Sequence, residues 1–292
     1  MSHTPVLLGE SIDALRVRPG GTYADGTFGG GGYSREILSR GGSVIALDRD
    51  ASAAPAARVL SEEYGARFEF YNERFSRMAE MLDGRKIDGL VLDLGVSSMQ
   101  IDEAERGFSY MRDGPLLMAM GLNRTDAFEI VNGYPPEKIA DIIYRYGEEP
   151  KSRQIARAIA AARPIATTLN LAATIRKTAG ERAVPRVFQA IRIAVNGELD
   201  ELDSILAASA DMLNPGGRLA VVSFHSLEDR MVKDFMRGGP ASTHASRYVP
   251  ESAPGASFPF KQVGKNAIMP SEAEARANPR AASAKLRVAE RI

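Results

Sequence analysis

The sequence has no cysteine, no tryptophan and only 3 histidines among its 292 residues. The lack of cysteine excludes a disulfide framework, thiolate metal ligands and a cysteine nucleophile. With no histidine cluster either, the sequence indicates no metal cofactor. No long uncharged apolar run is present, and residues 1–5 lack the basic and apolar pattern of a secretory signal. We therefore expect a cytoplasmic protein with no membrane partner.

A net charge is also absent, because 37 basic residues balance 37 acidic ones. The hydrophobic share of 44% and the charged share of 25% are typical of a soluble globular protein of one or two domains. The C-terminal segment, residues 261–292, is locally basic, with seven Lys or Arg against three Glu. This excess is a weak electrostatic footprint, since a solvated helix face often carries as much. If the partner is a nucleic acid, the residues expected to contact its phosphates are Arg276, Arg280, Lys285 and Arg287.

Strand-like and helix-length segments alternate over the first hundred residues. The strand-like segments are Thr22–Asp25, Ser43–Asp48, Arg67–Tyr71 and Ile87–Leu94. The helical segments between them are Tyr33–Ser39, Ala51–Glu63 and Phe75–Leu82. This alternation favours right-handed βαβ units and a parallel sheet.

The alternation stops near Ala104 and resumes after Pro185, with only helical patterning between, such as Lys151–Ala162. The later segments are a long helix at Phe188–Leu213, a strand at Arg218–Phe224, a loop at Gly238–Ser257, a helix at Ser271–Ala277 and a strand at Lys285–Ala289. The predicted fold is α/β, with a Rossmann-like sheet domain formed by residues 1–103 and 186–292. Residues 104–185 would form an inserted all-helical domain.

A glycine-rich segment, Asp25-Gly26-Thr27-Phe28-Gly29-Gly30-Gly31-Gly32, joins the first strand to the first helix. Glycines let a ligand approach the backbone closely, and a helix start offers free N–H groups. The segment does not fit the G-x-G-x-x-G pattern and has no P-loop lysine. Asp48 ends the second strand, where a carboxylate can accept hydrogen bonds from ribose hydroxyls, and Asp93 ends the fourth. The three features together predict a nucleoside-containing cofactor at the strand ends.

The chain resembles a known bacterial family, the MraW-like ribosomal RNA small subunit methyltransferases H. These enzymes methylate the exocyclic N4 of a cytidine in the decoding region of 16S ribosomal RNA. The resemblance runs almost end to end. It rests on His3-Thr4-Pro5-Val6-Leu7-Leu8, the glycine segment, Leu47-Asp48-Arg49-Asp50, Leu92-Asp93-Leu94-Gly95-Val96-Ser97-Ser98, Arg106-Gly107-Phe108-Ser109, Tyr146-Gly147-Glu148-Glu149, Ser223-Phe224-His225-Ser226-Leu227-Glu228-Asp229-Arg230 and Asn278-Pro279-Arg280.

The resemblance implies a class I methyltransferase that uses S-adenosyl-L-methionine, with the helical insert serving substrate recognition. It implies 16S rRNA within the small ribosomal subunit as the partner and allows a homodimer. The cofactor contacts that it implies are Gly31, Gly32, Tyr33, Asp48, Phe75, Asp93 and Gln100. Pattern alone also allows Phe75 to be a core anchor and Gln100 to be a surface residue.

Methyl transfer to an exocyclic amine needs a hydrogen-bond acceptor, because the amine lone pair is delocalised into the ring. We expect Asp93 to be this acceptor, helped by the backbone near Leu94 and Gly95. His225 and Ser223, near the end of the fifth strand, are weaker catalytic candidates, since a strand-end histidine is more often structural.

Three departures from the family pattern fall in Asp113-Gly114-Pro115-Leu116-Leu117-Met118-Ala119-Met120-Gly121. Leu117, Ala119 and Gly121 stand where the family usually has Asp, Arg and Asp. Tyr33 replaces a common His, and Val187 replaces a usual Thr. The changes at Leu117, Ala119 and Gly121 leave open an RNA-binding or ribosome-assembly factor that is catalytically weak or silent. A nicotinamide-dependent oxidoreductase, the other alternative, is disfavoured by the absent glycine fingerprint.

Overall fold

The computed structural model describes residues 5–239 and 258–292, which form two compact units. One unit, the sheet unit, comprises residues 1–95 and 199–292, and the other, the helical unit, comprises residues 96–198. The sequence placed the insert at residues 104–185, so the helical unit is wider at both ends. Within the described ranges, no helix is long and apolar enough to cross a membrane.

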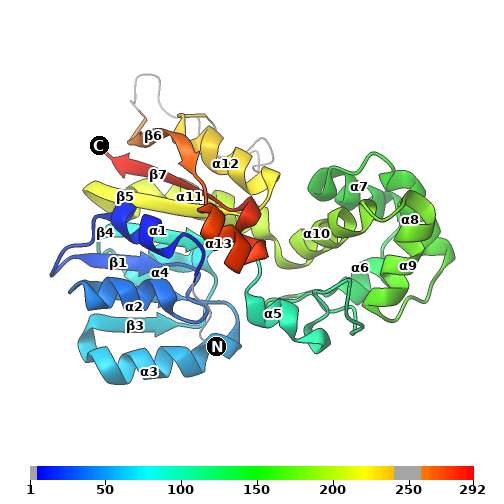
Figure 1. Cartoon of the computed structure of the whole chain (residues 1–292), viewed down its shortest axis with the longest axis horizontal. Coiled ribbons are helices and arrows are strands. Elements are labelled where there is room, and N and C mark those ends of the chain that lie inside the picture. The colour runs from blue at the N-terminus through cyan, green and yellow to red at the C-terminus, as the bar shows by residue number, and fades with distance from the viewer. Residues whose placement is uncertain (1–4, 240–257) are drawn as a thin grey trace. The chain divides into compact units, whose positions relative to one another are not determined.

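The sheet unit is built around seven strands in the order β3-β2-β1-β4-β5-β7-β6 (Figure 1). The strands are β1 Thr22–Asp25, β2 Ser43–Leu47, β3 Phe68–Tyr71, β4 Ile87–Asp93, β5 Leu213–Ser223, β6 Phe260–Ile268 and β7 Lys285–Arg291. Strands β1 to β5 are parallel, whereas β7 runs antiparallel to both β5 and β6. This confirms the predicted Rossmann-like α/β sheet. The strand order reverses between β1 and β4, which is where such sheets bind ligands at their carboxyl ends.

Helices cover the sheet and explain why its strands are apolar on both sides. The helices of the sheet unit are α1 Leu8–Leu15, α2 Gly32–Ser39, α3 Ala54–Tyr64, α4 Met78–Leu82, α11 Glu198–Met212, α12 Ser226–Met236 and α13 Glu272–Ala277. Helices α1, α2 and α3 pack on one face, where Tyr23, Val91 and Val222 join their apolar side chains (Figure 1). Alternate residues such as Leu90 and Leu92 are fully buried as well. A parallel strand buried on both faces needs this continuous apolar sequence.

The helical unit has no strand among its residues, as the sequence predicts, apart from an isolated bridge between Pro115 and Thr167. Its helices are α5 Ser98–Asp102, α6 Ala127–Gly133, α7 Pro136–Gly147, α8 Ser152–Ala161, α9 Thr168–Ala179 and α10 Ala183–Asn196. They enclose their own core, to which Ile143, Ile159 and Ile191 contribute fully buried side chains. The core of this unit is therefore formed by its own segments, separately from the core of the sheet unit.

Two predictions about the second half of the chain were wrong in detail, and one strand was missed. The single helix Phe188–Leu213 is two helices, α10 and α11, because Gly197 adopts a left-handed φ of 63° and ends α10. Strand β5 begins at Leu213 rather than Arg218, with a register shift at Pro215-Gly216-Gly217. Strand β6 was not predicted, and the predicted loop Gly238–Ser257 lies outside the described residues beyond Gly239.

Candidate functional site

The glycine segment between β1 and α2 forms a turn that leaves room for a ligand. Gly31 precedes α2 with a φ of 79°, a conformation that side chains other than glycine rarely adopt. A Cβ at Gly26 would stand 2.5 Å from the Leu92 Cδ2 atom, so any larger residue would force the buried Leu92 side chain to move. At Gly30, by contrast, nothing lies within 4 Å of where a Cβ would stand. The turn therefore has tight packing behind it and open space at Gly30.

Asp48 follows β2 and is held by the backbone of two neighbouring loops. Its Oδ2 accepts a hydrogen bond from the Gly29 N–H at 2.6 Å, and its Oδ1 accepts one from the Asp50 N–H at 2.8 Å. Burial raises the pKa of this carboxyl, while the two backbone bonds oppose that shift. Each carboxylate oxygen keeps a free lone pair. Asp48 is thus oriented beside the glycine turn with acceptor capacity left for ribose hydroxyls.

Asp93 ends β4 at the carboxyl edge of the sheet. Its backbone N–H donates to the Thr27 Oγ1 at 2.7 Å, which ties β4 to the glycine turn. Its Oδ1 atom is buried and has no hydrogen-bond partner in the described structure. Burial raises the pKa of Asp93 well above its usual value, and the nearby negative charges of Asp25 and Glu228 raise it further. An acceptor buried without a partner is costly unless a ligand satisfies it.

Asp25, at the end of β1, is a candidate site residue that the sequence analysis did not single out. It is fully buried and accepts hydrogen bonds from the Ser34 Oγ at 2.7 Å and the Thr27 N–H at 3.2 Å. Burial raises its pKa to about 6. Its place directly before the glycine segment, at the end of a parallel strand, was the signal that could have identified it.

The remaining predicted contacts of the sheet unit lie around the same turn. Phe75 is half-buried, and its Cβ lies 3.1 Å from where a Cβ on Gly26 would stand. Gly32 begins α2, with the ring of Pro5 filling the space of its missing side chain. Tyr33 is 3% exposed, and its hydroxyl donates to the Val6 carbonyl. The hydroxyl of Tyr33 is therefore already engaged within the protein.

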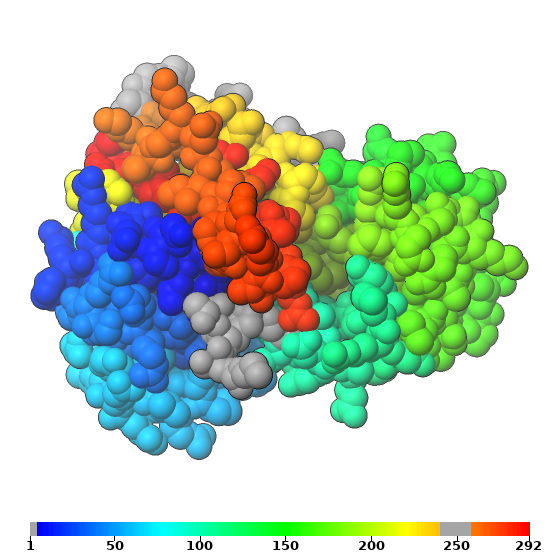
Figure 2. Space-filling model, viewed as in Figure 1, coloured from blue at the N-terminus to red at the C-terminus, as the bar shows by residue number. Residues whose placement is uncertain are grey.

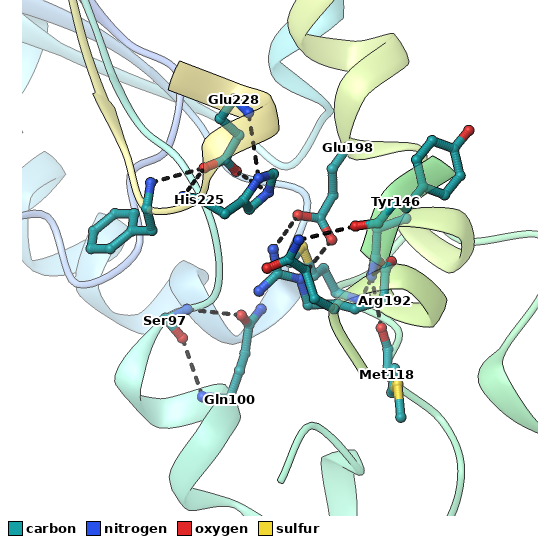
Figure 3. Close-up of polar contacts among 12 residues, drawn as sticks. Ser97, Gln100, Met118, Tyr146, Arg192, Glu198, His225 and Glu228 are labelled. Atoms are coloured by element: carbon teal, nitrogen blue, oxygen red, sulfur yellow. Dashed lines mark hydrogen bonds and ion pairs between the residues drawn. The ribbon is translucent and has the colours of Figure 1, made fainter. Parts of the chain in front are cut away.

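Gln100 belongs to the helical unit, where its side chain completes the capping box of α5. The side-chain Oε1 of Gln100 accepts from the Ser97 backbone N–H at 3.0 Å, and the backbone N–H of Gln100 donates to the Ser97 Oγ at 3.2 Å (Figure 3). The structure thus gives Gln100 a local role in starting α5. Its cofactor contact stays a prediction.

His225 and Ser223 take structural positions at the end of β5. His225 caps α12, with its Nδ1 accepting from the Glu228 N–H at 3.4 Å (Figure 3). Its Nε2 lies 3.1 Å from the Glu228 Oε1, but without hydrogen-bond geometry. The Ser223 Oγ donates to the Lys285 carbonyl at 3.4 Å, within the β5–β7 ladder. These contacts give both side chains a local role, and their catalytic roles stay predictions.

The C-terminal basic residues are largely engaged by carboxylates. Asp229 pairs with both the Lys285 Nζ at 3.0 Å and the Arg287 Nε at 2.7 Å, and these cations lower its pKa against the effect of burial. Arg276 pairs with Glu272 at 2.6 Å on α13, whose surface lies beside that of α1 (Figure 2). The Arg287 side chain is only 11% exposed. Its geometry therefore favours holding α12 to β7 over binding phosphate.

The three departures in the loop of residues 113–121 differ in burial, because Leu117 is exposed whereas Ala119 is partly buried against the core of the helical unit. Leu116, Met118 and Met120 are buried, whereas Leu117 between them is 38% exposed. The buried side chain of Asn196 holds this loop. Its Oδ1 accepts from the Met120 N–H at 2.9 Å, and its Nδ2 donates to the Met118 carbonyl at 2.8 Å. The side chains that anchor the loop belong to its alternate residues, while Leu117, Ala119 and Gly121 contribute backbone hydrogen bonds.

The residues at this strand edge fit S-adenosyl-L-methionine. Asp48 offers acceptors for a ribose, Gly30 leaves open space, and Phe75 offers an aromatic ring next to the turn. The unpartnered Oδ1 of Asp93, together with Asp25, suits a cationic ligand, because a positive charge would stabilise both carboxylates.

Comparison with known proteins agrees with this geometry. Residues 1–292 match the MraW methylase family. The chain belongs to this family. A ribosomal RNA small subunit methyltransferase H from Caulobacter sp. (strain K31) is 50% identical, over 99% of this chain and 93% of that protein. One from Paramagnetospirillum magneticum is 49% identical, over 99% of this chain and 95% of that protein.

A solved structure of an rRNA methylase from Streptococcus thermophilus aligns with 100% of this chain and 99% of its own. Its TM-score is 0.43 and its identity 12%, so no inference rests on it. Membership of a methylase family confirms the family that the motifs indicate and supports S-adenosyl-L-methionine as the cofactor.

Proposed function

We propose that this protein transfers a methyl group from S-adenosyl-L-methionine to the exocyclic N4 of a cytidine in the decoding region of 16S ribosomal RNA. The observation that carries the chemistry is the buried, unpartnered Oδ1 of Asp93 at the switch point of the sheet. The rRNA substrate is supported by the names of relatives about 50% identical across 99% of the chain. The cytidine N4 position rests on the resemblance in motifs.

S-adenosyl-L-methionine supplies a methyl group activated by its sulfonium charge. Within the protein, Asp48 orients a ribose and the glycine turn admits the ligand close to the backbone. Asp93 accepts a hydrogen bond from the amino group of the base, which brings electron density to a nitrogen whose lone pair is delocalised. The base must leave its stack to reach a buried acceptor, so the substrate is expected to be flipped or single-stranded.

A catalytically weak or silent RNA-binding factor remains the second candidate. It is favoured by Leu117, which leaves an apolar and 38% exposed side chain where the family usually has a carboxylate. The two candidates differ in turnover and not in fold.

Methyl transfer from labelled cofactor to small ribosomal particles lacking the modification tests the proposal. We expect label in 16S rRNA and N4-methylcytidine after digestion to nucleosides. The matched control is Asp93→Asn, which keeps the shape of the side chain but removes the carboxylate. Label on another base or position would overturn the cytidine assignment, and cofactor binding without any transfer would favour the silent factor.

A further inference from the structure

The helical unit contains a long stretch without any acidic residue. Residues 150–180 include no Asp or Glu, although the whole chain has 37. The cations of this stretch are Lys151, Arg153, Arg157, Arg163, Arg176 and Lys177. This stretch therefore carries positive charges only, although the net charge of the whole chain is zero.

Two of the six cations are engaged within the protein. The guanidinium of Arg163 donates to the carbonyls of Val131 and Tyr134, so this residue fixes a loop. Arg176 pairs with Glu181, just beyond the stretch. Contacts within the protein therefore account for the positive charges of Arg163 and Arg176.

The cations of α8 differ, because they are exposed and have no acidic partner among the described residues. Helix α8 buries Ile155, Ala156 and Ile159 against the core of the unit. Lys151, just before the helix, and Arg153 and Arg157 on it are exposed to solvent. Nothing in residues 5–239 and 258–292 forms an ion pair with these three side chains.

The cations of α8 gather at the start of the helix. The start of a helix carries a partial positive charge, which cations in its first turn reinforce and a carboxylate offsets. Lys151 and Arg153 occupy this end and the first turn contains no acidic residue, while the Glu149 carboxylate just before the helix accepts from the Lys151 backbone N–H at 3.0 Å and pairs with Arg186. Arg157 lies one turn after Arg153 and therefore on the same face. An anion at this surface would relieve the repulsion.

We propose that the α8 face, defined by Lys151, Arg153 and Arg157, binds RNA phosphates and docks the rRNA substrate on the helical unit. This inference rests on the proposed function and names the surface that holds the substrate. The planar guanidinium of an arginine can contact a phosphate through two donors at once, and Arg153 and Arg157 have no ion pair to break before they do so. The C-terminal cations Lys285 and Arg287 would first have to leave the carboxylate of Asp229.

The salt dependence of RNA binding tests the proposal. The test variant is Arg153→Ala with Arg157→Ala, and the probe is a 16S rRNA transcript that spans the decoding region. Each phosphate contact contributes about 0.7–0.9 to the slope of log K against log salt, so losing two should flatten the slope by roughly 1.5. We expect affinity at 0.1 M salt to fall by about tenfold or more. Affinity for S-adenosyl-L-methionine, measured by calorimetry, should not change.

Two further variants separate charge from folding. Arg153→Lys with Arg157→Lys keeps both charges and should restore most of the slope. Arg58→Ala removes an exposed arginine of α3 and should leave RNA binding unchanged. A double alanine variant with the slope and affinity of the parent would overturn the proposal, as would a parent protein that does not bind the transcript. If the parent methylates ribosomal particles but the double alanine variant keeps the salt slope of the parent, only the docking surface is wrong and the proposed function stands.

Discussion

The carboxylates near the strand ends of the sheet unit and the cations of the α8 face differ in how they are held. Asp25 and Asp48 accept hydrogen bonds from neighbouring groups at the strand ends, and Asp229 on α12 is held by two cations. On the helical unit, Arg153 and Arg157 stand exposed on α8 without an acidic partner among the described residues. The difference indicates that the two sets of charges serve different purposes. Chemistry needs a few groups held in place, whereas docking of a polyanion needs charges that are free to pair with it.

The largest effect should come from Asp93, whose Oδ1 is buried without a hydrogen-bond partner. Asp93→Asn should lower the rate of methyl transfer by about tenfold or more, because the amide oxygen still accepts a hydrogen bond but has lost the charge that makes such a bond about twice as strong. The free energy of unfolding should stay the same or rise, because a charged group with a buried oxygen that lacks a partner destabilises the protein alone. Single-turnover transfer and urea unfolding measure the two quantities. Transfer at the wild-type rate would show that Asp93 has only a structural role. A large loss of stability would show that its carboxylate has a stabilising partner in the protein.

A moderate effect, on stability and not on RNA, is expected at the C-terminal strand. Arg287→Leu removes one of the two cations of Asp229 and should lower the free energy of unfolding by about 1–3 kcal/mol, since a partly buried charge loses a partner. Its effect on the salt slope of RNA binding should be small compared with that of the α8 variant. Urea unfolding and RNA titrations at several salt concentrations check both. A flattened slope with unchanged stability would show that Arg287 is a phosphate contact and would remove the contrast between the units.

The smallest effect is expected in the loop that departs from the family. Leu117→Asp with Ala119→Arg should raise RNA methylation by a few fold and leave affinity for S-adenosyl-L-methionine unchanged, because the new charges lie in the helical unit. Gly121 should be left as it is, since its φ of 128° would strain any other residue. Steady-state methylation of small ribosomal particles gives the answer, with Leu169→Asp as a control for adding a charge to another half-exposed leucine. Equal methylation by parent and double variant would mean that the loop sequence does not matter to turnover.

Most of the sheet was predictable because both faces of its strands are buried. Segments such as Val44-Ile45-Ala46-Leu47 have to be apolar throughout, and this pattern is visible without a structure. Strand β6 could not be recognised, because only Phe260 of its nine residues is buried and Gly264 interrupts it. An edge strand of this kind is defined by its pairing with β7 and not by its own periodicity.

The candidate site was predictable to a similar degree. Strand ends, the glycine segment and the carboxylates at Asp48 and Asp93 can be recognised because chain order and sheet topology bring them to one edge. The importance of Asp25 was missed, because burial and hydrogen bonding to Ser34 decide its state. The hydroxyl of Tyr33 bonds to the Val6 carbonyl, a pairing that no local pattern indicates, and the cofactor contact of this residue stays a prediction.

The sequence by itself determined the class of sheet, the family and the type of cofactor, since these depend on local periodicity and on ordered motifs. The tertiary structure alone decided which charges are available. Lys285 and Arg157 look alike in the sequence, yet one faces Asp229, 56 residues away, and the other faces solvent. The reason is physical: a charge acts on a ligand according to its burial and its neighbours, and both are set by contacts between residues distant in the chain.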